Sequence, residues 1–172
     1  IEVETESTAL SVDEANIGTT AGAKATIDDV TALFTVTEGN DTAETVYTLD
    51  ASGLEDVEAL INGTWTPVES EGDGTAEVTG KVGDVTVFTL SIADEKLTFT
   101  QEVVLKHEGS DPAEADDLDL GSVDIVATVT DKDGDVVSET STVTLKVTDA
   151  VPEIEVVTGQ TDLKVDEADI SD

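Results

Sequence analysis

The chain of 172 residues contains no cysteine, no methionine and no arginine, and it has one histidine and five aromatic residues. Without cysteine, no disulfide framework, thiolate metal site or cysteine nucleophile can form. The scarcity of rings leaves a core built mainly from Val, Leu, Ile and Ala. No apolar run approaches the roughly 20 residues that a membrane-spanning helix needs. These absences favour a domain with an aliphatic core and no transmembrane helix.

Positive charge is equally scarce, because seven lysines stand against 41 aspartates and glutamates, for a formal net charge of −34. A nucleic-acid binder needs a basic patch to neutralise phosphates, so this class is excluded. The same sign argues against binding to an anionic membrane surface or inserting into it. Since so many like charges repel one another in the compact state, we expect divalent cations to compensate them.

The sequence offers few residues that could carry out catalysis. A Ser-His-Asp triad would have to use His107, which lies in a polar stretch without a nucleophile-elbow motif. The many acids allow carboxylate pairs of the glycosidase type, but nothing singles out one pair. We therefore expect that the protein is not an enzyme and that His107 is a solvent-exposed loop residue. Trp65, beside a hairpin turn, is expected to be a packing residue.

Short alternating segments rich in Val and Thr recur along the chain between Gly, Asp and Asn. Period-two alternation between turn signals is typical of an antiparallel sandwich. The sequence therefore predicts an all-β, immunoglobulin-like β-sandwich. The expected strands are Ile1–Glu4, Ala9–Val12, Ala32–Val36, Thr45–Leu49, Val57–Ile61, Thr64–Val68, Thr75–Thr79, Val85–Ile92, Lys96–Leu105, Ser122–Thr130 and Val136–Thr148.

Asn62-Gly63 is the strongest local turn signal, because both residue types tolerate positive φ. It predicts a hairpin between the segments Val57–Ile61 and Thr64–Val68. A helical turn at Gly53–Asp56 is the competing interpretation, since the apolar residues that begin there have helical spacing.

One expected strand carries its apolar residues on both faces. In a regular strand Val85 and Val87 share one face, whereas Leu90 and Ile92 share the other. We expect either burial on both sides or a β-bulge near Thr89.

The chain also contains a long internal repeat. Residues 154–171, IEVVTGQTDLKVDEADIS, match residues 1–18, IEVETESTALSVDEANIG, at 11 of 18 positions with a constant offset of 153. A fixed period of this kind indicates a tandem array. We expect residues 1–153 to form one repeat unit and residues 154–172 to be the opening strand of the next unit, with the boundary at Asp149–Pro152.

An acidic turn, Asp-Lys-Asp-Gly-Asp, is the best candidate for a metal site. It places Asp131, Asp133 and Asp135 at alternate positions around a glycine, and calcium prefers six to eight such oxygen ligands. The EF-hand pattern fails further on, where Val136 replaces the required Gly and Thr142 the required Glu. The segment therefore predicts a calcium-binding turn on a β scaffold, with a solvated hairpin turn as the alternative.

Further candidate ligands lie near the unit boundary. If the last two strands are antiparallel neighbours, their acidic turn lies at the end opposite Asp149 and faces the preceding unit. Asp13 and Glu14, repeated as Asp166 and Glu167, close the first strand region. We therefore expect Asp13, Glu14 and Asp149 to contribute to calcium binding at the ends of the module.

Several segments together resemble the bacterial immunoglobulin-like repeats of giant RTX adhesins secreted by type I systems. They are Val129-Thr-Asp-Lys-Asp-Gly-Asp135, Val147-Thr-Asp-Ala-Val-Pro152, Val87–Ile92 with the following Leu97-Thr-Phe-Thr, and the His107…Asp111-Pro112 region before a Val-rich strand. The family usually has Asp, His and Pro close together, and the chain departs from it where His107 and Asp111 are separated.

The resemblance implies a calcium-rigidified extender module that holds a distal ligand-binding domain away from a Gram-negative cell. Its partners would be neighbouring repeat units of the same chain, and the module itself would be monomeric, extracellular and non-catalytic. Two alternatives stay open. One is a carbohydrate-binding module of the same adhesin, and the other is an acidic surface-layer domain whose charge serves hydration.

Overall fold

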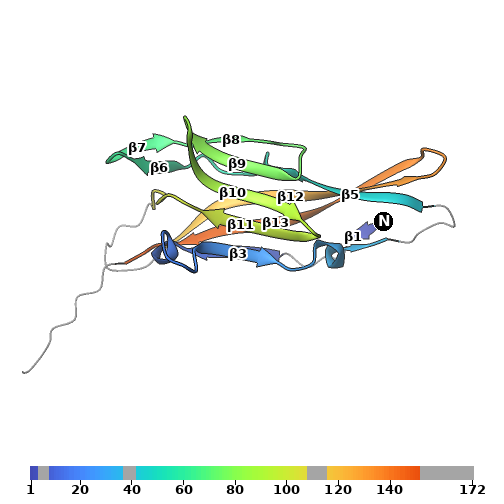
Figure 1. Cartoon of the computed structure of the whole chain (residues 1–172), viewed down its shortest axis with the longest axis horizontal. Helices are drawn as coiled ribbons and strands as arrows, with labels where there is room; N and C mark the ends of the chain where they lie inside the picture. The colour runs from blue at the N-terminus through green and yellow to red at the C-terminus, as the bar shows by residue number, and fades with distance from the viewer. Residues whose placement is uncertain (4–7, 37–41, 108–115, 152–172) are drawn as a thin grey trace, which may run out of the picture.

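The structure is a computed structural model that describes residues 1–3, 8–36, 42–107 and 116–151 (Figure 1). Within these ranges it is nearly all β, with two short 3₁₀ turns, η1 (Glu14–Asn16) and η2 (Val30–Leu33), and no α-helix. The expected opening strand of a next unit, residues 154–172, lies outside the described residues.

Two sheets form the body of the molecule, and their inner faces share one hydrophobic core. The five-stranded sheet has the order β3 (Ala23–Ile27), β11 (Lys96–Gln101), β10 (Val85–Ala93), β9 (Glu77–Val82) and β8 (Glu69–Glu71). The four-stranded sheet has the order β2 (Thr8–Asp13), β13 (Val136–Thr148), β12 (Asp117–Asp131) and β5 (Thr42–Asp50). All neighbours are antiparallel except β2 and β13, which are parallel.

The strand order is that of an immunoglobulin-like sandwich. If β2, β3, β5, β10, β11, β12 and β13 are lettered A to G, one sheet contains B-E-D and the other contains C-F-G. Strand A lies beside G, and the connection from C to D carries β8 and β9, which extend the B-E-D sheet. The predicted all-β sandwich is thus confirmed.

The predicted Asn-Gly hairpin is present as β6 (Glu58–Ile61) and β7 (Thr64–Pro67). Asn62 and Gly63 have φ of 51° and 78°, as a type I′ turn requires. The competing helical turn at Gly53–Asp56 is wrong, because these residues form turns and a bridge instead.

The bulge expected in β10 is also present, slightly earlier than predicted. The pairing of β10 with β9 shifts register between Thr86 and Phe88, so that Val87 and Phe88 are both buried. Opposite the bulge lies Gly80, where a Cβ atom would come within 2.2 Å of the Phe88 ring. The bulge therefore turns two successive side chains inward and needs a glycine to make room for one of them.

Other boundaries differ from the sequence-based prediction. Strand β3 was not predicted, and residues 32 and 33 belong to η2, with only β4 (Phe34–Thr35) extended after it. Strand β4 pairs with β1 (Glu2–Val3). Strand β12 begins at Asp117 instead of Ser122, because it continues through a register shift between Asp119 and Ser122.

The core is aliphatic, as the composition predicted, with Phe88 and Phe99 in edge-to-face contact at its centre. Along β11 and the second half of β13, alternate residues point inward. The apolar residues that are 0% exposed are Val30, Leu49, Ala59, Val78, Val87, Leu90, Leu97, Phe99, Val123, Ile125, Ala127, Val143, Leu145 and Val147.

Candidate cation sites at the two ends of the sandwich

Acidic residues gather at both ends of the long axis. The β12–β13 turn extends beyond the rest of the sandwich at one end, and the last residues of β13 lie at the other (Figure 1). The described structure contains two groups of side chains whose ligand atoms lie within 4.8 Å of one another. One is Asp131, Asp133 and Asp135, and the other is Glu14, His107 and Asp149.

The first group is the predicted turn, and it is organised around Asp131. The Asp131 Oδ1 atom accepts hydrogen bonds from the backbone N–H groups of Asp133, Gly134 and Asp135, at 3.2, 3.0 and 2.9 Å. The Gly134 backbone has a φ of 95°, which the turn needs and glycine adopts freely. The three carboxylates are therefore held close together by the backbone of the turn itself.

Electrostatics within this turn are asymmetric. A side-chain hydrogen bond with Asp133, together with the N–H of Asp135, lowers the pKa of Asp131. The same hydrogen bond, and the charge of Asp131, raise the pKa of Asp133. Asp131 is therefore the more readily ionised of the two carboxylates. A bound cation would relieve the repulsion between them.

The second group arises from the parallel pairing of β2 and β13. Thr148 lies opposite Asp13 in the register, so the next residues, Glu14 and Asp149, leave the sheet side by side. Asp13 points elsewhere, because its Oδ1 accepts the Ala15 N–H at 2.9 Å and caps η1. The structure therefore brings together two of the three boundary acids that the sequence singled out.

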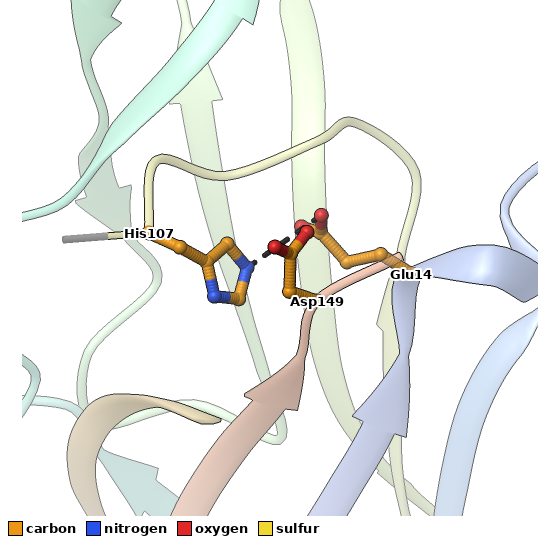
Figure 2. A group of neighbouring side chains, drawn as sticks. All are labelled: Glu14, His107 and Asp149. Atoms are coloured by element: carbon orange, nitrogen blue, oxygen red, sulfur yellow. Dashed lines mark ion pairs between the residues drawn. The ribbon is translucent and has the colours of Figure 1, made fainter. Parts of the chain in front are cut away.

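His107 completes this group, and the expectation that it is an exposed loop residue is wrong. Its side chain is 8% exposed, and its Nε2 atom lies 3.6 Å from Glu14 Oε2. Figure 2 shows the His107, Glu14 and Asp149 side chains converging from three separate segments. The Nδ1 atom of His107 lies 3.0 Å from the carbonyl oxygen of Asp116.

Glu14 is buried, with a side chain that is 1% exposed. Its Oε1 atom accepts hydrogen bonds from the backbone N–H of Leu105, at 2.8 Å, and from Nε2 of Gln101. Its Oε2 atom has no hydrogen-bond partner, and neither has Nε2 of His107. One carboxylate oxygen is thus fixed by the protein, while the other faces an imidazole nitrogen that is also unsatisfied.

The sequence contains a signal that His107 points inward. Leu97, Phe99 and Gln101 point inward along β11, and Leu105 is buried after the strand has ended. His107 is the next residue in this period-two series. The alternation therefore predicts an inward histidine, although the residues that follow it are polar.

A cleft of about 630 Å³ adjoins the second group, and His107 is part of its lining. Six acids line it as well, namely Glu55, Asp56, Glu58, Asp116, Asp117 and Asp119. Its lysine, Lys106, is paired with Glu58. The cleft is therefore a strongly negative opening beside the buried histidine.

The two polar-edged aromatic residues are not grouped. Trp65 lies in the β6–β7 hairpin and is 40% exposed, so the expectation that it is a packing residue is wrong. Tyr47 lies in β5 against Phe34, with ring centroids 5.9 Å apart, and burial raises the pKa of its hydroxyl. They belong to different sheets and form no shared platform.

A family model described as a domain of unknown function (DUF5801) matches residues 9–144, which is most of the sandwich. No curated protein and no solved structure matches the chain. Across the part of the chain that the structure describes, no helix is long and apolar enough to cross a membrane.

Proposed function

The chain belongs to the DUF5801 family, and we propose that it is a calcium-binding extender module of a bacterial surface adhesin. In this role it is a non-catalytic spacer that acts outside the cell, in tandem with neighbouring units of the same chain. It holds a distal ligand-binding domain away from the surface, and calcium stiffens the array.

The observation that carries this proposal is the match between residues 1–18 and 154–171 at a constant offset of 153. The sandwich ends at Thr148, so the repeat begins again within a few residues of its last strand. A linker that short, containing Pro152, restrains how far successive units can separate or bend. An array with such joints is suited to spanning distance.

Geometry supports the same role. The β12–β13 turn extends from the end opposite the β13 exit (Figure 1), so in a head-to-tail array it approaches the preceding unit. Next to the turn, Val136 and Val137 are 59% and 53% exposed. Exposed valines on a projecting hairpin favour contact with a neighbouring unit.

Chemistry at the turn favours calcium as the stiffening ion. Asp131, Asp133 and Asp135 offer only oxygen ligands, and Asp131 already accepts three backbone N–H groups that fix its position. Extracellular modules bind calcium at about 10⁻⁴ to 10⁻³ M. Such sites fill outside the cell and stay empty in the cytosol, which leaves the chain loose for export.

Carbohydrate binding is the second candidate, and the exposure of Trp65 is the observation that favours it. A binding module would present several rings together, whereas Tyr47 lies half-buried on another sheet. A glycan-array signal that is lost in Trp65→Ala would support this alternative over the extender.

Calcium binding at the turn can be tested by calorimetry and thermal unfolding. We expect saturable binding, with a rise in unfolding midpoint of roughly 5–10 °C when free calcium is about a hundredfold above Kd. The variant Asp131→Asn/Asp133→Asn should lose most of that rise, because two ligands become neutral. The matched control Asp84→Asn/Asp94→Asn removes the same charge from the exposed turns at the two ends of β10. This variant should keep the calcium-dependent rise in the unfolding midpoint.

Equal calcium responses in the two double variants would contradict binding at the turn. Absence of any saturable calcium site at moderate salt would favour the acidic surface-layer alternative, in which the charge serves hydration.

A further inference from the structure

We propose that Glu14, His107 and Asp149 bind a divalent transition-metal ion of the zinc class. All three residues belong to one sandwich, so the site is complete without a neighbouring unit and does not depend on the extender function. It also differs chemically from the all-oxygen turn at the other end of the molecule.

The first argument is the pair of unsatisfied atoms at the centre of the cluster. His107 Nε2 and Glu14 Oε2 face each other at 3.6 Å, which is too long for a hydrogen bond, and neither has another hydrogen-bond partner. Both side chains are more than nine-tenths buried. Because an unsatisfied buried polar group destabilises the fold, two of them aimed at one point indicate a ligand between them.

The second argument is the way the imidazole is held. The Nδ1–H group of His107 donates to the carbonyl oxygen of Asp116 at 3.0 Å, which leaves the lone pair on Nε2 directed at Glu14. The same carbonyl oxygen accepts the backbone N–H of Asp149 at 3.2 Å. One carbonyl thus orients two of the three residues, as outer-shell partners of metal ligands do.

Glu14 is held in a corresponding way. The Leu105 N–H and the Gln101 amide both donate to Oε1, so this oxygen is satisfied and the carboxylate cannot rotate freely. The remaining oxygen, Oε2, is left for a ligand. The carboxylate is therefore positioned before any ion arrives.

Ligand type decides the class of metal. An imidazole with carboxylates suits zinc and its first-row neighbours, whereas calcium prefers oxygen ligands alone. Two ligands of a tetrahedral zinc ion, each about 2.0–2.2 Å from the metal, are about 3.3–3.5 Å apart. The observed 3.6 Å between Nε2 and Oε2 is close to this separation, and all three ligand atoms lie within 4.8 Å of one another.

An ion also has a route to the site. The acidic cleft of about 630 Å³ reaches His107, and its carboxylates attract cations toward the buried end. With three protein ligands, a water molecule from this side can complete a tetrahedral coordination.

The test uses the whole chain, stripped with a chelator and titrated with zinc chloride in millimolar calcium, which occupies non-specific acidic sites. We expect one zinc ion per chain. His107→Gln removes the imidazole, and Glu14→Gln keeps Oε1 as an acceptor while replacing Oε2 by an amide. Each should weaken zinc binding by more than about a hundredfold, beyond the usual effect of losing an outer-shell partner. Asp133→Asn, at the other end, should change it little.

Spectroscopy on the protein without substitutions provides a readout that does not depend on whether the variants fold. On adding zinc, the ¹⁵N resonance of His107 Nε2 should shift strongly, and cobalt in place of zinc should give the visible absorption of a tetrahedral site. Zinc binding that persists in His107→Gln, or an Nε2 resonance that zinc leaves unchanged, would overturn the assignment. In that case His107 and Glu14 pair with each other and hold no metal ion.

Discussion

Several aspartates of this chain close turns by accepting backbone hydrogen bonds. Asp13 accepts from Ala15 and Asp29 accepts from Thr31, each at the start of a 3₁₀ turn, and Asp50 accepts from Ser52. The acidic composition thus has a local structural use as well as an electrostatic cost. Clusters of acids therefore indicate cation-binding sites, whereas the acidic composition alone does not.

Asp29 gives a direct test of this local role. Its Oδ1 accepts the hydroxyl and the N–H of Thr31, at 2.5 and 2.9 Å, and the side-chain hydrogen bond is the main reason that the pKa of Asp29 is lowered from 3.8. A lowered pKa stabilises the fold above the unfolded-state value, and this contribution is lost as the pH falls through the folded-state value.

We therefore expect the Asp29 carboxyl to titrate below its ordinary range in an NMR pH titration. Thr31→Val, which removes the hydroxyl donor and keeps the shape, should raise that pKa. The interpretation is wrong if Asp29 titrates at its ordinary value in the parent protein, or if Thr31→Val leaves the titration unchanged.

Among the elements, β12 shows how an irregularity determines which residues enter the core. Leu120 and Val123 are both buried although they are three residues apart, because the strand shifts register around Gly121. Gly121 has a φ of 83°, and a Cβ there would lie 2.3 Å from the carbonyl oxygen of Gly53. The bulge therefore needs glycine both for its backbone conformation and for close packing.

Substituting this glycine should be costly. We expect Gly121→Ala to lower the free energy of unfolding by about 3 kcal/mol, since it adds a backbone clash to left-handed strain. Gly18→Ala is the control, because Gly18 has a φ of 73° but nothing lies within 4 Å of its Cβ position. It should cost about 1 kcal/mol, from strain alone. Equal losses in urea unfolding would show that the contact with Gly53 is unimportant.

Elements with clear alternation were predictable from sequence, as was the Asn62-Gly63 hairpin, because local propensity and tertiary packing agree there. The short strand β3 was missed, since its inward side chains include two alanines that give a weak hydrophobic signal. The start of β12 was placed too late because polar residues at its edge resemble a loop. Bulges appear in sequence only as a break in the inward pattern, and their position depends on the partner strand.

The two candidate sites also differ in how far the sequence predicts them. Asp131, Asp133 and Asp135 lie in one turn, so their proximity follows from sequence spacing alone. Glu14 and Asp149 were selected from the repeat boundary, but their adjacency depends on the parallel pairing of β2 with β13. His107 joins them only through the path of the chain after β11, which no local pattern of charges reveals.

For the whole molecule, the net charge of −34 is the dominant electrostatic fact. In the proposed array, acids at both ends of the long axis would repel the ends of neighbouring units, and a divalent ion at a joint would convert that repulsion into attraction. The proposed role of calcium is therefore mechanical, in that the ion should fix the angle between units. Stabilisation of a single sandwich is a weaker consequence of the same binding.

X-ray scattering on a tandem pair measures this most directly. Residues 1–153 followed by a second copy of residues 1–172 reproduce the joint that the repeat offset of 153 predicts. With millimolar calcium, we expect a larger maximum dimension and radius of gyration than with chelator, since the joint straightens. Placing Asp131→Asn/Asp133→Asn in the second copy alone should remove most of the increase. Dimensions that do not change on adding calcium would contradict the extender account.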